Sequence, residues 1–253
     1  MKGIKFLIAV MLLGTVFSFN VKVTTATTKA ETLYVVADNL NVREKASTKS
    51  KKVGSLKLGS KVKVYSKTNS GWSKIDYKKK KAYVFSEYIK KAPKNQYSRI
   101  NFFAKQGQIE PALPLAVNDK ISSLINVLGK PTDEYNTGYG FYMDYHKKDF
   151  TTTFVMQESG KYHPIESYKD LNKNAYIQQM EFYVSKNEKN TFKNLKSALG
   201  KPYSIEDNNN HSYLLAYYDL GKFYVGFMFP KKDYKDETIS DNDRLIQYRV
   251  ILK

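Results

Sequence analysis

The chain has 253 residues, of which 42% are hydrophobic and 26% charged, and its formal net charge at pH 7 is +18. It contains no cysteine, which excludes disulfide bonds, cysteine nucleophiles and cysteine metal sites. This length is enough for two small domains, whose stability must therefore come from packed cores.

The first 30 residues have the pattern of a secretory signal peptide. Two lysines precede an apolar run at 6–17, which is shorter than the roughly 20 residues that span a bilayer. The small residues Ala26 and Ala30 are candidate cleavage points. We therefore expect residues 1–30 to direct secretion, with no membrane attachment after cleavage; an uncleaved N-terminal anchor is the alternative. A secreted chain without cysteine is typical of a Gram-positive bacterium.

The positive charge is concentrated in one part of the chain. Residues 33–91 carry sixteen basic residues against four acidic ones, whereas residues 92–253 have a net charge of only +3. A strongly basic surface attracts polyanions over long distances. Outside a Gram-positive cell these are the teichoic acids and the wall, so we expect a wall polyanion rather than nucleic acid as the partner. The alternative is that the lysines only keep this domain soluble.

Residues 33–91 read as short β-strands separated by turns. The segment 61–65 alternates, with Val62 and Val64 on one face and lysines on the other, and the segment 72–77 alternates again after a turn at 69–71. About five short strands in fewer than 60 residues predict a small all-β barrel.

The motifs of this segment resemble those of a bacterial SH3 domain. They occur in the order Leu40-Asn41-Val42-Arg43, Gly71-Trp72-Ser73-Lys74-Ile75, Tyr83-Val84 and Glu87-Tyr88-Ile89. The resemblance implies attachment to the cell wall or binding of peptidoglycan peptides. This chain departs from the family at the last strand, where Gly-Trp-Val is usual and Ala82-Tyr83-Val84 is present after four lysines. The departure favours an electrostatic contact.

The candidate ligand-binding residues of this domain are an aromatic pair and a lysine cluster: Trp72, Tyr83, Lys78, Lys79, Lys80 and Lys81. Trp72 is either a half-exposed platform beside the lysines or a core residue of the barrel. Arg43 is expected to brace a turn by donating hydrogen bonds to carbonyl groups.

Residues 92–95 are a short linker, and residues 96–253 are predicted to form a duplicated α+β domain. A helix is expected over 96–107. Leu-Gly-Lys-Pro then occurs at 128–131 and again at 199–202, an offset of 71 residues.

The repeat defines two units, at about 118–184 and 190–253. Each unit is predicted to be a helix, a tight stop and three β-strands. The first helix is expected to begin at the N-cap Asn118, and the second at Asn190 or Thr191. A glycine followed by a proline ends both helices.

Two such units would form one antiparallel sheet with helices on one face and an open, aromatic face. Tyr142 and Tyr213 are the candidate ligand-binding residues there, and they share the offset of 71. Phe154, Tyr217 and Phe227 are further candidates, because alternation alone does not decide which aromatics point outward.

This arrangement resembles the tandem-repeat fold of the β-lactamase inhibitor proteins and, per unit, the SmpA/OmlA-type lipoproteins. The segment 102–107 leading to 127–131 (Phe-Phe-Ala-Lys-Gln-Gly and Val-Leu-Gly-Lys-Pro) is similar to a domain of unknown function in secreted proteins of Gram-positive spore formers. The resemblance implies a binding or inhibitory scaffold without a known reaction.

No motif indicates catalysis, a metal or a cofactor. His146, His163 and His211 lack metal-ligand spacing, and Asp241-Asn242-Asp243 favours a turn over a calcium site. The nucleophile elbow Gly-x-Ser-x-Gly is absent.

The leading hypothesis is a secreted, non-enzymatic wall-binding protein whose second domain binds a protein or glycan. The alternatives are a proteinaceous inhibitor of an extracellular enzyme and an unrecognised wall hydrolase. The hydrolase would need an acidic pair on the open sheet.

Overall fold

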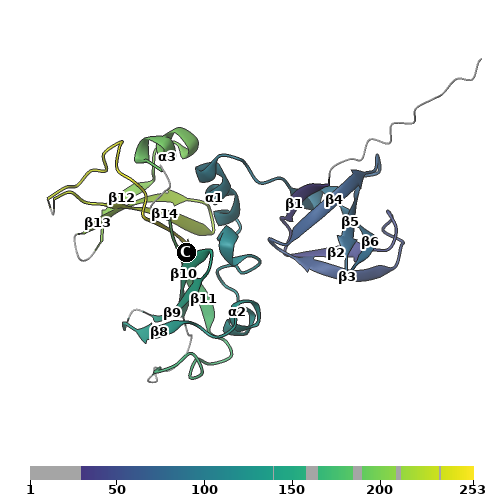
Figure 1. Cartoon of the computed structure of the whole chain (residues 1–253), viewed down its shortest axis with the longest axis horizontal. Coiled ribbons are helices and arrows are strands. Elements are labelled where there is room, and N and C mark those ends of the chain that lie inside the picture. The colour runs from purple at the N-terminus through teal and green to yellow at the C-terminus, as the bar shows by residue number, and fades with distance from the viewer. Residues whose placement is uncertain (1–29, 139, 158–164, 185–189, 209–211, 234) are drawn as a thin grey trace, which may run out of the picture.

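The computed structural model describes residues 30–253, apart from 139, 158–164, 185–189, 209–211 and 234. The expected signal peptide thus lies, except for its last residue, outside the described residues. The described chain is mostly β, with two antiparallel sheets and three α-helices (Figure 1). In this part of the chain, no helix is long and apolar enough to cross a bilayer.

The first sheet, here called the basic domain, has seven strands in the order β3-β2-β6-β5-β4-β1-β7. Its alternating residues, such as Val62 and Val64, point into one core and are 4–5% exposed, as the sequence predicts. The strands are β1 Glu31–Val35, β2 Asn39–Arg43, β3 Lys52–Lys57, β4 Lys61–Lys67, β5 Trp72–Tyr77, β6 Lys80–Phe85 and β7 Ile89–Lys90.

The second sheet, with its helices, is here called the C-terminal domain. It has eight strands in the order β12-β13-β14-β15-β11-β10-β9-β8. The strands are β8 Asp133–Asn136, β9 Phe141–Lys147, β10 Phe150–Gln157, β11 Tyr176–Tyr183, β12 Ser204–Asp207, β13 Tyr213–Asp219, β14 Phe223–Pro230 and β15 Gln247–Leu252. The helices are α1 Gln96–Ala104, α2 Ile121–Leu128 and α3 Phe192–Leu199.

The helices pack against one face of this sheet, as expected. Tyr97 of α1 packs edge-on against Phe227, and Phe192 of α3 packs in the same way against Phe229. Leu124 of α2 is completely buried in the same core. The opposite face carries no helix among the described residues and is here called the open face.

Each half of the C-terminal domain contains one helix followed by four strands, so the prediction of three strands was wrong. The missed strands, β8 and β12, are short edge strands of mainly polar, exposed residues. They have no buried apolar positions and therefore lack the alternation that would have revealed them. The two halves meet where β11 pairs with β15.

The helix ends follow the predictions more closely than the helix starts. Gly129 and Gly200 end α2 and α3 with φ angles of 79° and 82°, a left-handed region that favours glycine. The side chain of Thr191 accepts a hydrogen bond from the Asn194 N–H and caps α3. Asn118 does not cap α2, because it has a φ of 73° and lies two residues before the N-cap Lys120.

A tyrosine ties each helix end to its own hairpin. The hydroxyl of Tyr145 donates to the Gly129 carbonyl and that of Tyr218 to the Gly200 carbonyl, both at 3.0 Å. These tyrosines are 73 residues apart, whereas the glycines are 71 apart. The expected correspondence of Tyr142 with Tyr213 is therefore wrong: Tyr142 pairs with Val155 inside the sheet, whereas Tyr213 pairs with the terminal Pro230 of β14.

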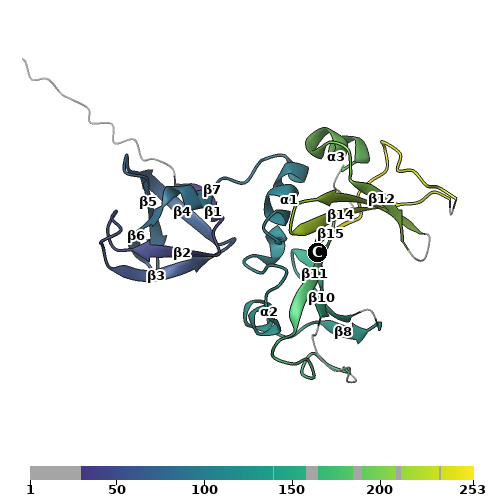
Figure 2. The same ribbon diagram turned by 180° about the vertical axis from the view of Figure 1, so that it is seen from behind.

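The two domains touch through α1, which lies with α2 between the basic domain and the second sheet in both views (Figures 1 and 2). The ring of Tyr34 in β1 packs edge-on against Phe103, with centroids 5.0 Å apart. Arg99 Nη2 donates to the Tyr34 hydroxyl at 2.7 Å and also pairs with Glu110. These contacts are here called the domain joint.

Candidate functional site

The basic domain has a groove at one end of the β5–β6 hairpin. Trp72 packs edge-on against Phe85 at 5.3 Å, on the side of the hairpin that faces away from the core. Although Trp72 is only 6% exposed, it lines a groove of about 420 Å³ together with Arg43, Thr48 and Tyr88. Trp72 is thus a buried residue in the wall of the groove, and the interpretation as a half-exposed platform is wrong.

Arg43 shapes this groove, as expected from the sequence. Its Nη1 donates to the Ser50 carbonyl at 2.7 Å and so braces the loop between β2 and β3. Tyr83 pairs with Arg43 across β2 and β6 and shares the outer side of the hairpin with Trp72. Tyr83 lies outside the set of residues that line the groove.

The four clustered lysines divide into two kinds. Lys78 and Lys79 form the hairpin turn with φ angles of 48° and 65°, a left-handed conformation that asparagine and glycine usually supply. Together with Lys80 they are exposed at the tip. Lys81 instead lies over the Tyr65 ring and pairs with Asp76 at 2.6 Å. Lys78 also lies over a ring, that of Tyr77, at 5.4 Å, but within the described part of the chain no acidic side chain pairs with Lys78, Lys79 or Lys80.

On the open face of the C-terminal domain, one row of paired residues crosses all eight strands. It is here called the polar row, and from β8 to β12 it consists of Asp133, Asp144, Thr153, Glu181, Arg249, Gly226, Tyr217 and Ser204. Its central pair, Glu181 and Arg249, lies where the two halves of the domain meet.

Glu181 is a largely enclosed charged group of the row. Its side chain is 13% exposed, and its carboxylate accepts hydrogen bonds from the amides of Gln179 and Gln247. Arg249 Nη1 is 3.9 Å away. Burial raises the pKa of the Glu181 carboxyl, and these three neighbours only partly oppose the effect.

Arg249 has an incomplete set of partners. Its Nη2 donates to the Tyr217 hydroxyl, and its Nε is buried with no hydrogen-bond partner among the described residues. The ring of Tyr217 lies over Gly226, where a Cβ atom would approach the ring to 2.6 Å. The glycine therefore creates the space that lets Tyr217 reach Arg249.

Tyrosines flank the polar row. Tyr142 and Tyr135 stack in parallel, with centroids 5.1 Å apart and planes at 9°, beside Asp144. Tyr135 is 43% exposed. Burial and the nearby Asp144 charge raise its pKa to about 12, so its hydroxyl stays protonated at neutral pH.

The structure sorts the aromatic candidates by face. Tyr142, Tyr213 and Tyr217 lie on the open face, whereas Phe154 and Phe227 belong to the completely buried core on the helix face. Sequence reasoning missed the polar residues of the face. Gln179, Glu181 and Tyr183 alternate with the core residues Met180 and Phe182, and that alternation was the available signal.

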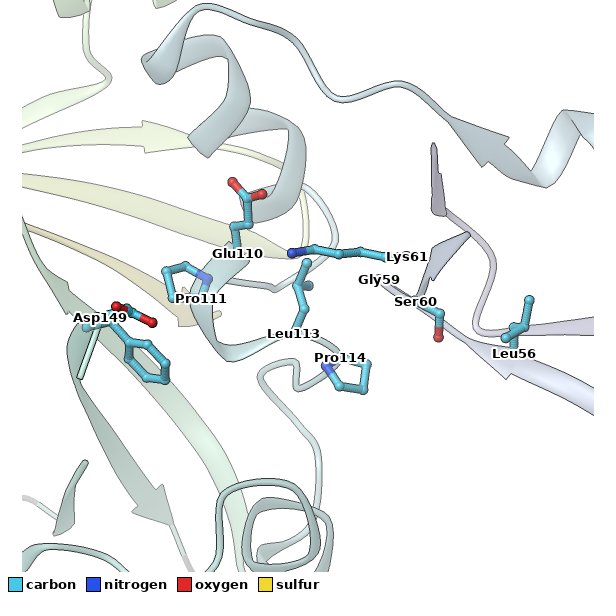
Figure 3. Close-up of a pocket in the computed structure, with 10 residues that line it drawn as sticks. Leu56, Gly59, Ser60, Lys61, Glu110, Pro111, Leu113, Pro114 and Asp149 are labelled. Carbon is cyan, nitrogen blue, oxygen red and sulfur yellow. The ribbon is translucent and has the colours of Figure 1, made fainter. Parts of the chain in front are cut away.

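A cleft of about 700 Å³ separates the two domains below the joint. Lys61 extends from β4 toward Glu110, and Leu113, Pro114 and Asp149 line the other side (Figure 3). Glu110 is already held by Arg99 and by the Tyr34 hydroxyl at 3.0 Å. Glu110 is thus engaged in the domain joint.

The described residues contain no group of three or more His, Asp or Glu side chains that could hold a metal ion. His163 and His211 lie outside the described part of the chain. The turn predicted at 241–243 is confirmed, because Asp243 Oδ2 accepts from the Ser240 N–H at 2.7 Å.

Residues 38–90, which include most of the groove lining, match the family described as bacterial SH3 domain. Residues 97–242 match a domain of unknown function, DUF4309. Because that match covers more than half of the chain, the protein belongs to the DUF4309 family. Its N-terminal part adds a bacterial SH3 domain.

Two solved structures are similar at low identity. A DUF4309 family protein (YjgB) from Bacillus subtilis is 15% identical, with 62% of this chain and 95% of that chain covered and a TM-score of 0.46. The C-terminal domain of TagH is 10% identical, with 89% and 98% covered and a TM-score of 0.24. No curated protein matches the chain significantly.

Proposed function

We propose that this protein is a secreted, cell-wall-associated binding protein of a Gram-positive bacterium, and that it is not an enzyme. The basic domain attaches it to the wall, and the C-terminal domain holds a partner on its open face. The observation that carries this proposal is a bacterial SH3 match in a segment that carries sixteen basic residues against four acidic ones. Residues 1–30 act as the export signal.

The basic domain offers two routes to the wall. The exposed tip lysines Lys78, Lys79 and Lys80 suit a polyanion such as teichoic acid, which a basic surface attracts over long distances. The groove beside Trp72 and Arg43 suits a short peptide. Salt screens exposed charges over distances of about 10 Å at 0.1 M. The lysine route is therefore salt-sensitive and the groove route much less so.

The domain organisation follows from the same proposal. The bacterial SH3-like domain spans 33–91, residues 92–95 link it to the α+β domain of 96–253, and units 118–184 and 190–253 of that domain arose by duplication. The equivalent hydrogen bonds of Tyr145 and Tyr218 to the helix-ending glycines support the duplication. So does the order of one helix and four strands in each half.

Co-sedimentation tests the proposal directly. Residues 31–253 are mixed with purified Gram-positive walls, with and without teichoic acids, at low and high salt. Binding that needs teichoic acid and is lost at high salt supports lysine attachment, and binding that survives both changes supports the groove. No binding under any condition would contradict wall association.

A wall hydrolase is the second candidate, favoured by one observation. Asp144 and Glu181 lie on the same face, two strands apart, on either side of Thr153. Their Cα atoms are thus about 10 Å apart, and glycosidases use pairs of carboxylates flanking the bond they cleave. Loss of turbidity in a suspension of purified walls would support the hydrolase, and a stable turbidity would argue against it.

A further inference from the structure

The composition of the open face is not explained by folding alone. A partly buried charge costs free energy unless it is paired and hydrogen-bonded, and a pair of such charges is often no more stable than apolar residues of the same size. Glu181 and Arg249 are nevertheless placed at the centre of the face, with Thr153 only 2% exposed beside them. Stability of the fold alone therefore does not account for this arrangement.

We propose that the open face binds the glycan strand of peptidoglycan, with the polar row bonding the hydroxyl and acetamido groups and the flanking tyrosines stacking on the sugar rings. This inference rests on the proposed wall association and names the partner of the C-terminal domain.

The hydrogen-bonding groups of the row match the chemistry of a sugar. Each hydroxyl of a sugar both donates and accepts, so its site needs acceptors and donors side by side. Carboxylates offer about four acceptor positions each. Asp144 uses one for the Thr153 hydroxyl at 2.6 Å. The Tyr217 hydroxyl accepts a hydrogen bond from Arg249 and keeps its own proton to donate. The row therefore retains both kinds of group for a ligand.

The aromatic groups complete the match. Stacked Tyr135 and Tyr142 present a broad apolar surface at the β8–β9 end of the row, and Tyr217 and Tyr224 lie edge to face, 6.4 Å apart, toward the other end. From β9 to β13 the row crosses six strands, or about 24 Å at the usual strand spacing. The face is therefore long enough for several sugar units.

The charge of the face selects an uncharged polymer over a polyanion. Acidic side chains outnumber basic ones on the face, and Lys253 at its edge is paired with Asp219. The acidic residues are Asp133, Asp144, Glu181, Glu206 and Asp219. Phosphates of teichoic acid would be repelled here, whereas the tip lysines of the basic domain attract them. The two domains thus suit two different polymers of the same wall.

The test uses chitopentaose, a linear pentamer of N-acetylglucosamine, as the probe. Titration calorimetry measures its affinity for residues 31–253 and for the variants Tyr142→Ala and Glu181→Gln. Loss of the Tyr142 ring is expected to weaken binding about fivefold to tenfold, from the usual contribution of an aromatic contact. Tyr88→Ala is the comparison variant, since Tyr88 lines the groove of the basic domain, which is the competing site for the pentamer. Thermal unfolding confirms that each variant is folded.

The outcomes separate this inference from the proposed function. Pentamer binding that weakens in Tyr142→Ala but not in Tyr88→Ala supports the inference. Binding to whole walls without binding to the pentamer overturns the inference and leaves wall association intact. Pentamer binding that is lost only in Tyr88→Ala also overturns the inference and leaves wall association intact. Failure to bind both walls and pentamer contradicts both proposals. Cleavage of the pentamer overturns a pure binding role.

Discussion

The basic domain and the open face of the C-terminal domain use charge in opposite ways. At the hairpin tip, Lys78 and Lys79 are exposed on a strained turn. On the open face, Glu181 and Arg249 are mostly enclosed and held by amides and a tyrosine hydroxyl. Exposed charges act over long distances and are screened by salt, whereas enclosed and oriented groups act only at contact. The first arrangement suits capture and the second suits recognition.

The largest expected effect comes from disturbing the floor of the open face. In Gly226→Ala the new methyl group would lie 2.6 Å from the Tyr217 ring and 3.4 Å from the Arg249 side chain. Overpacking of this kind typically costs about 1–3 kcal/mol. Urea unfolding measures the loss. If the clash with Tyr217 is the cause, the same change costs much less in a Tyr217→Ala background; an equal cost in both backgrounds would contradict this explanation.

A smaller effect is expected from the hairpin tip. Replacing Lys78, Lys79 and Lys80 with glutamine removes three exposed charges without changing the core, and about a tenfold loss of affinity for teichoic-acid-containing walls at low salt is expected. Co-sedimentation measures the loss.

The matched control for the tip replaces Lys130, Lys169 and Lys173, three exposed lysines of the C-terminal domain, with glutamine. It changes the net charge equally and should retain most of the binding. Equal losses in the two triple variants would mean that total charge matters and the position of the lysines does not.

The features that sequence analysis recovered are those set by neighbouring residues. The alternation around Val62 and Val64 predicted a core strand, and the Gly-Lys-Pro stops predicted the ends of α2 and α3. The bracing role of Arg43 also depends on a partner only seven residues away, and it is confirmed. Short-range sterics and periodicity are sufficient for these features.

The polar row could not be found in this way, because it depends on distant pairings. Glu181 meets Arg249 only because β11 pairs with β15, and Asp144 joins them through β10. Register decides which residues face each other, and a shift by one residue would move every side chain to the opposite face. Alternation assigns the residues of a strand to two faces of the sheet but does not show which face the helices cover. It therefore could not show that Phe154 is in the core and Tyr142 on the open face. Edge strands such as β8 lack even that signal.

The smallest expected effect is a difference between two glutamates in how their contribution to stability depends on pH, because their pKa values are shifted in opposite directions. Burial disfavours the Glu110 carboxylate in the domain joint, but hydrogen bonds and charge from Arg99 outweigh this and hold its pKa below the ordinary value of 4.5. Ionised Glu110 therefore stabilises the fold above pH 4.5, and this contribution is lost as the pH falls through its lowered pKa.

Glu181 should show the reverse dependence, because burial raises its pKa above 4.5. Its protonated form is favoured in the folded state, so the stabilising effect is complete below pH 4.5 and is lost as the pH rises through the raised pKa. Glutamine does not titrate, and the stability of the wild type relative to each Glu→Gln variant therefore isolates one group. As the pH is lowered from neutral, the urea midpoint of the wild type should rise relative to that of Glu181→Gln. At still lower pH, the urea midpoint of the wild type should fall relative to that of Glu110→Gln. Parallel shifts in the two comparisons would contradict the distinction between the enclosed row and the paired joint.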